Sequence, residues 1–189
     1  MLFRSGPSSN DIRKRFSFSS VYELPVGPGK RWLSKGVTSQ IVGGWTLGTI
    51  ASVQSGAPFT VTTNTNNTNT FSAGNQRANV LRDPVLPADQ RDVKRWFDIT
   101  AFTQPAIYTF GNGARNNMRG PGLANVDLSI LRNFKIRETI LFQFRGEFLN
   151  AMNHTNLGLP NGAFGNAAFG QINASKPARV MQIGIKMRF

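Results

Sequence analysis

Five stretches of this sequence alternate apolar and polar residues with a period of two. Successive side chains of a β-strand point to opposite faces, so such alternation predicts strands that each have one apolar face. In the last stretch the apolar positions are Met181, Ile183, Ile185, Met187 and Phe189. The other four stretches are residues 12–24, 41–53, 126–134 and 140–149. The sequence therefore predicts an all-β fold with about five long strands.

The connections between these strands alternate in length. Residues 25–39 and 135–138 are short or moderate, whereas the connections at about 56–122 and 153–177 are long. Outer-membrane barrels have short turns on the periplasmic side and longer loops outside the cell. This rhythm predicts antiparallel strands that run down, up, down, up and down, with an extracellular loop at about 56–122 and a periplasmic C-terminus.

The long connection at about 56–122 has two kinds of sequence. Residues 62–70 are polar and of low complexity, and we expect the second half of this segment to be an exposed loop. Further along, aromatic residues recur: Trp96, Phe97, Phe102, Tyr108 and Phe110. We therefore expect the connection to fold back on itself.

The chain can cross a membrane only through its strands. It has no stretch of about eighteen apolar residues, so no transmembrane helix is expected. A strand of about twelve residues reaches ~40 Å, enough to cross an apolar band ~25 Å tall at a tilt.

Single-chain bacterial barrels have an even number of strands, and five cannot close one. Residues 1–16 also lack the apolar segment of a secretory signal. The whole chain, 1–189, is therefore expected to be the C-terminal part of a larger transmembrane β-barrel.

Composition argues against several other classes of function. The chain has 22 Lys and Arg against 9 Asp and Glu, but the basic residues are dispersed and lie opposite the phenylalanines. Nucleic acid binding, which needs a basic groove interleaved with aromatics, is therefore not expected. There is no cysteine, and the one histidine, His154, has no nearby carboxylate or thiol at metal-ligand spacing. No G-x-S-x-G pattern is present, and the Gly-rich residues 111–122 lack the ending of a phosphate loop. We expect no enzyme activity, no metal and no cofactor.

Two groups of polar residues suggest partners. Gln143, Arg145 and Glu147 share the polar side of the strand at 140–149 and are expected to face the lumen of a barrel or a plug inside it. Lipid would disfavour an Arg at its midplane by ~2–4 kcal/mol. The basic run at residues 13–15 is a candidate contact with lipopolysaccharide phosphates.

Several short motifs in the sequence resemble those of a known protein family. The most specific are QSGAPF at residues 54–59, RGPGLANVDLS at 119–129 and FRGEFLNAMNHTN at 144–156. Together with the terminal strand, they resemble the C-terminal end of TonB-dependent, Oar-like outer-membrane transporters.

The resemblance implies a roughly 22-stranded, plugged barrel that takes up a ligand. Energy would come from the TonB complex through an N-terminal part that this chain lacks, and the outer-membrane lipid would surround the barrel. The resemblance also implies that the barrel-assembly machinery recognises the apolar terminal strand, with the assembly signal on its alternate residues: Met181, Ile183, Ile185, Met187 and Phe189.

A soluble or secreted β-sandwich that acts as a binding module is the alternative. A sandwich also needs one apolar face per strand, so alternation alone fits both folds. The short and long rhythm of the connections and the terminal Phe189 favour the barrel.

Overall fold

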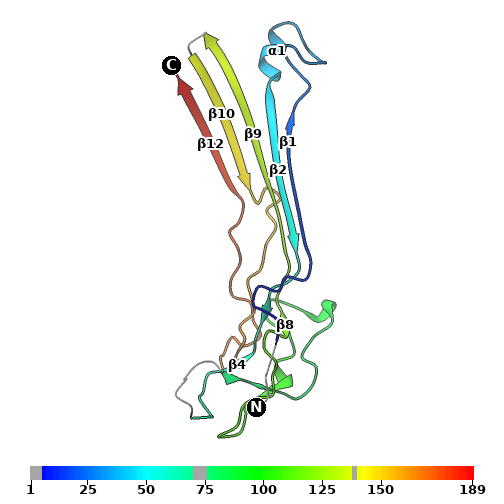
Figure 1. Cartoon of the computed structure of the whole chain (residues 1–189), viewed down its shortest axis with the longest axis vertical. Helices are drawn as coiled ribbons and strands as arrows, with labels where there is room; N and C mark the ends of the chain where they lie inside the picture. The colour runs from blue at the N-terminus through cyan, green and yellow to red at the C-terminus, as the bar shows by residue number, and fades with distance from the viewer. Residues whose placement is uncertain (1–5, 70–75, 138–139) are drawn as a thin grey trace. The chain divides into compact units, whose positions relative to one another are not determined.

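The computed structural model describes residues 6–69, 76–137 and 140–189 (Figure 1). The chain divides into two compact units. We call Phe16–Val53, Ala124–Thr155 and Pro177–Phe189 the strand unit. Met1–Arg15, Gln54–Leu123 and Asn156–Lys176 make up the loop unit.

The strand unit contains a sheet of five long strands (Figure 1). Their order in space follows their order in the sequence: β1 (Arg15–Glu23), β2 (Trp45–Gln54), β9 (Leu123–Arg137), β10 (Ile140–Leu149) and β12 (Val180–Arg188). β10 pairs antiparallel with both β9 and β12, so Phe144 lies opposite Arg132 on one side and Ile185 on the other. At the other side of the sheet, Leu24 N donates to Trp45 O at 2.9 Å. The prediction of an antiparallel all-β fold is confirmed.

The predicted strand bounds need correction at several ends, and Leu24 of the predicted strand at 12–24 follows β1. The stretch 41–53 is not a strand throughout, because its first residues belong to a short helix, α1 (Val37–Val42). The strand at 126–134 is longer than predicted, since β9 extends from Leu123 to Arg137 and includes most of the predicted turn at 135–138. Residues 12–14 precede β1, and Phe189 follows β12. Residue 138 lies outside the described residues.

Two glycines explain why β2 begins late. A Cβ at Gly43 would lie 2.3 Å from the Cα of Gly27, so this close backbone approach admits no side chain. Gly44 has a φ of 77°, in the left-handed region that glycine adopts without strain. The chain leaves α1 through these two residues, and the alternating pattern starts again at Trp45.

The loop unit is built from short pairings. β3 (Pro58–Phe59) pairs with β8 (Met118–Arg119), and β6 (Asn79–Val80) pairs with β7 (Phe102–Thr103). β4 (Thr62–Thr63) lies between β5 (Gln76–Arg77) and β11 (Ala163–Phe164). The 3-10 turns η1 (Ala88–Gln90) and η2 (Ile99–Ala101) complete the regular structure in the described part of this unit. No described helix of the chain is long and apolar enough to span a membrane.

An aromatic cluster forms the core of the loop unit. Phe97 is 1% exposed, and its ring centroid lies 5.9, 5.6 and 5.2 Å from those of Phe59, Phe102 and Phe169. Two of these contacts are edge-to-face, a geometry that adds about 0.5–1.5 kcal/mol beyond area burial. Phe169 comes from the second long connection, so both long connections share one core. The prediction that residues 56–122 fold back on themselves is confirmed.

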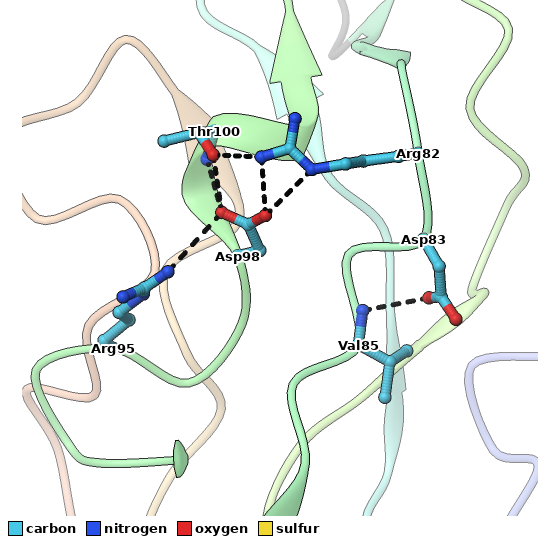
Figure 2. A network of polar contacts seen from close by, with 6 residues as sticks. All are labelled: Arg82, Asp83, Val85, Arg95, Asp98 and Thr100. Carbon is cyan, nitrogen blue, oxygen red and sulfur yellow. Dashed lines mark hydrogen bonds and ion pairs between the residues drawn. The ribbon is translucent and has the colours of Figure 1, made fainter.

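Asp98 joins two segments of the loop unit (Figure 2). Its carboxylate accepts from Arg82 Nη2 at 2.8 Å and from Thr100 N at 3.0 Å, which caps η2. Arg95 adds a longer ion pair of 3.7 Å. The hydrogen bonds from Thr100, together with those from Arg82, outweigh partial burial and hold the pKa of Asp98 below its usual range.

We expect this network to make the loop unit sensitive to acid. A lowered pKa in the folded state means that the ionised carboxylate stabilises the fold above its unfolded pKa of about 4, and that this contribution is lost as the pH falls below that value. Asp98→Ala should therefore speed hydrogen exchange at Thr100 N at neutral pH, and much less at low pH. Asp83→Ala is the control, since Asp83 accepts from Val85 N at 2.9 Å within the same connection (Figure 2). Equal exchange at Thr100 in Asp98→Ala and wild type at neutral pH would contradict this role.

Candidate functional site: the two faces of the long sheet

The terminal strand β12 lies at one edge of the sheet and presents an apolar row. Met181, Ile183, Ile185 and Met187 lie opposite Phe148, Gly146, Phe144 and Phe142 of β10, and paired residues of antiparallel strands share a face. Ile183 and Ile185 are each 71% exposed. Phe189 follows the strand and is 95% exposed. Four of the five predicted assembly residues therefore form one apolar row on β12, and Phe189 follows that row.

Aromatic side chains gather on this apolar face near the turn between β9 and β10. Phe134, Phe142, Phe144 and Ile185 line a shallow hollow of about 270 Å³. The ring of Trp45 meets that of Phe144 edge-to-face, with centroids 5.7 Å apart. Transmembrane barrels have such aromatic girdles where the apolar band meets the interface.

Arg132 is the exception on the apolar face. The register places it beside Phe144, in agreement with the sequence pattern, in which Leu131 and Arg132 fall out of phase. Its guanidinium carbon lies 4.1 Å from the ring centroid of Phe134 and 5.4 Å from that of Trp45, and it donates to Ile41 O. The side chain is buried, with 6% exposed.

These rings shield a charge that lipid would disfavour. An Arg on the lipid face costs ~2–4 kcal/mol at the midplane and little near the interface. Two cation–π contacts at about 1 kcal/mol each offset a cost of that size. Arg132 is thus part of the aromatic cluster on this face.

Gln143, Arg145 and Glu147 lie on the opposite, polar face. They pair with Asn133, Leu131 and Ser129 of β9, as the alternation requires. Gln143 Nε2 donates to Asn133 Oδ1 at 3.0 Å, and Arg145 forms an ion pair with Glu147. Arg145 and Glu147 line a hollow of about 440 Å³ together with Ser19, Asp127 and Ser129. The three predicted residues share one polar wall, and its exposure to a lumen or plug stays a prediction.

The motif residues after β10 form a structural corner. Asn150, buried and with a φ of 51°, donates from its backbone to Asp127 Oδ1 at 2.8 Å. Its side chain exchanges hydrogen bonds of 2.9 and 3.0 Å with the backbone of His154. Asn153 Oδ1 accepts from Arg179 N at 3.1 Å, which ties the entry of β12 to the exit of β10. His154 therefore belongs to a hydrogen-bonded turn, which is tied to Asp127 of β9.

The sequence pattern missed a second polar cluster, in the loop unit. Arg91, Trp96 and Arg119 line one cavity with Arg13, although they are far apart in the sequence. No local spacing connects them, so only the fold reveals the cluster. Among the described residues, no group of three or more His, Asp or Glu could hold a metal ion.

We expect Trp45 and Arg132 to be energetically coupled. In a double-mutant cycle with Trp45→Leu and Arg132→Gln, the coupling free energy of unfolding should be about 1 kcal/mol, because removal of the ring uncovers the charge. Trp45→Leu with Lys186→Gln is the control, since Lys186 pairs with Gln143 on the polar face. Urea titration in detergent micelles or vesicles measures both cycles. A coupling near zero for the first pair would show that the ring does not shield Arg132.

Comparison with known proteins agrees with the geometry of this sheet. The chain matches a family model described as an outer membrane beta barrel domain over residues 2–182. No curated protein and no solved structure matches the chain significantly. The long antiparallel strands with one apolar face are the architecture that crosses an outer membrane. The chain therefore belongs to the outer membrane β-barrel domain family and lies in the cell outer membrane.

Proposed function

We propose that this chain supplies the closing barrel strands and surface loops of a TonB-dependent, Oar-like transporter for ligand uptake. One observation carries the proposal: the long sheet of this chain ends at β1 and β12, so both edges are open to further strands of a barrel. An unpaired strand edge is unfavourable in lipid, where each backbone polar group needs a partner. The sequence motifs at 54–59, 119–129 and 144–156 support the assignment as a transporter within the outer membrane β-barrel domain family.

The proposed orientation follows from the connections. β1 joins β2, and β9 joins β10, through the shorter connections, which belong on the periplasmic side. The loop unit consists mainly of the two long connections, which belong outside the cell. In this orientation the C-terminus is periplasmic, and Gln143, Arg145 and Glu147 face the lumen or plug.

The proposed partners follow from the two faces. The apolar face contacts outer-membrane lipid, and residues 13–15 contact lipopolysaccharide phosphates through their positive charge. The barrel-assembly machinery reads the apolar row of β12, and the TonB complex acts through the N-terminal part of such a transporter. Neither nucleic acid nor a catalytic reaction forms part of the proposal.

The exposed apolar row argues against the β-sandwich alternative. A sandwich buries the apolar faces of its sheets against each other. Here Met181, Ile183 and Ile185 are 63–71% exposed, as expected for side chains that meet lipid.

Genetic epistasis tests the transport role. In the source bacterium, deletion of the gene and deletion of the TonB energy system should each slow growth on the same limiting nutrients. The double deletion should be no worse than the TonB deletion alone, because transport without energy is already lost. A gene deletion whose growth defect adds to that of the TonB deletion would contradict a TonB-dependent role.

The assembly signal is tested separately. Phe189→Gln should lower the amount of folded protein in the outer membrane several-fold, measured by the heat-modifiable band after fractionation. Phe110→Gln is the matched control, because Phe110 is an aromatic in the loop unit that is 64% exposed. Equal yields of the two variants would show that Phe189 carries no assembly signal.

A further inference from the structure

The loop unit contains a cavity of about 340 Å³, within the size range of small-ligand sites. Its apolar floor is Leu86, Phe97 and Met118, which are 8, 1 and 3% exposed. Its wall is cationic, since Arg13, Arg91 and Arg119 line it and no acidic residue does among the residues described. The cavity thus combines a buried apolar base with three guanidinium groups.

Hydrogen bonds fix the walls of this cavity. Trp96 Nε1 donates to Arg119 O at 2.8 Å, and Trp96 N donates to Gly170 O at 2.9 Å. Arg91 Nε donates to Leu86 O at 2.7 Å, and its guanidinium carbon lies 5.7 Å from the Trp96 ring centroid. One nitrogen of Arg91 is thereby used for positioning, which leaves its two terminal nitrogens for a ligand. A site held in this way needs little ordering when it binds.

The charges in the wall are not balanced. Arg119 is neutralised by Asp11, with which it forms an ion pair, and its side chain is 21% exposed. In the part of the chain that the structure describes, neither Arg13 nor Arg91 forms an ion pair. Two guanidinium groups beside an apolar floor therefore lack a counter-charge. Guanidinium recognises planar carboxylate and phosphate oxygens through paired hydrogen bonds.

We propose that this cavity binds the phosphate or carboxylate group of an anionic ligand. Arg91 and Arg13 contact the oxyanion, and Trp96 with Leu86 contacts the apolar part of the same ligand. Asn117 adds an amide at the wall. The inference concerns binding only, and it holds whether or not the chain serves TonB-dependent uptake.

Binding by the full chain in detergent micelles tests the site. Tryptophan fluorescence is followed during titration with inorganic pyrophosphate, malonate or purified lipopolysaccharide at constant ionic strength. The double variant Arg13→Gln with Arg91→Gln should weaken binding of at least one probe by about tenfold, the scale of a lost charged hydrogen bond. Lys94→Gln with Lys176→Gln is the control, because it removes the same charge from the loop unit outside the cavity.

The outcomes separate the sources of the oxyanion. Arginine-dependent binding of pyrophosphate or malonate supports the proposal and assigns a soluble ligand. Arginine-dependent binding of lipopolysaccharide alone supports it and assigns a lipid headgroup. Failure of all three probes to bind saturably, or equal weakening in the control variant, overturns it. Circular dichroism and the Thr100 N exchange rate establish that each variant retains the fold.

Discussion

The register of the antiparallel sheet is the constraint on which the rest of the structure depends. The inner strands β2, β9 and β10 each pair with a neighbour on both sides. Paired backbone hydrogen bonds are the condition for crossing an apolar layer. The pairing of Phe144 with Ile185 keeps the large side chains of β10 and β12 on one face. A slip of one residue would move Arg145 and Glu147 to that face and put the phenylalanines on the polar one. The apolar face on one side and the polar wall on the other therefore have the same cause.

The long strands could be predicted from the sequence because alternation is a local signal. Apolar and polar residues alternate within each strand, and in β12 this alternation is unbroken from Met181 to Met187. The start of β2 could not be predicted in the same way. Ile41 continues the apolar phase of Trp45, but Ile41 belongs to α1, and the chain then passes close to Gly27 at Gly43. The contact between Gly27 and Gly43 joins residues that are far apart in the sequence, so local periodicity does not predict it.

The candidate sites also differ in how far they can be predicted from the local sequence pattern. The polar row of Gln143, Arg145 and Glu147 follows from alternation within one strand. Arg132 is visible in the sequence as a residue out of phase, but its shielding by Trp45 depends on how two strands are paired. The cavity around Arg91 brings together three separate parts of the chain sequence, and Trp96 reaches Arg119 only in the folded loop unit. The spacing of these residues in the sequence does not predict such a site.

The central claim is that the apolar face of the long sheet meets lipid. The chain has no cysteine, so single cysteines at each position from Met181 to Met187 can carry a spin label without background. In outer-membrane vesicles, accessibility to oxygen dissolved in lipid should be high at Met181, Ile183 and Ile185 and low at Gln182 and Gly184, and accessibility to a water-soluble nickel complex should be the reverse. Oxygen accessibility that does not alternate from one residue to the next would contradict a sheet face that meets lipid. Equal accessibility of Ile183 and Gln182 to the nickel complex would contradict it as well.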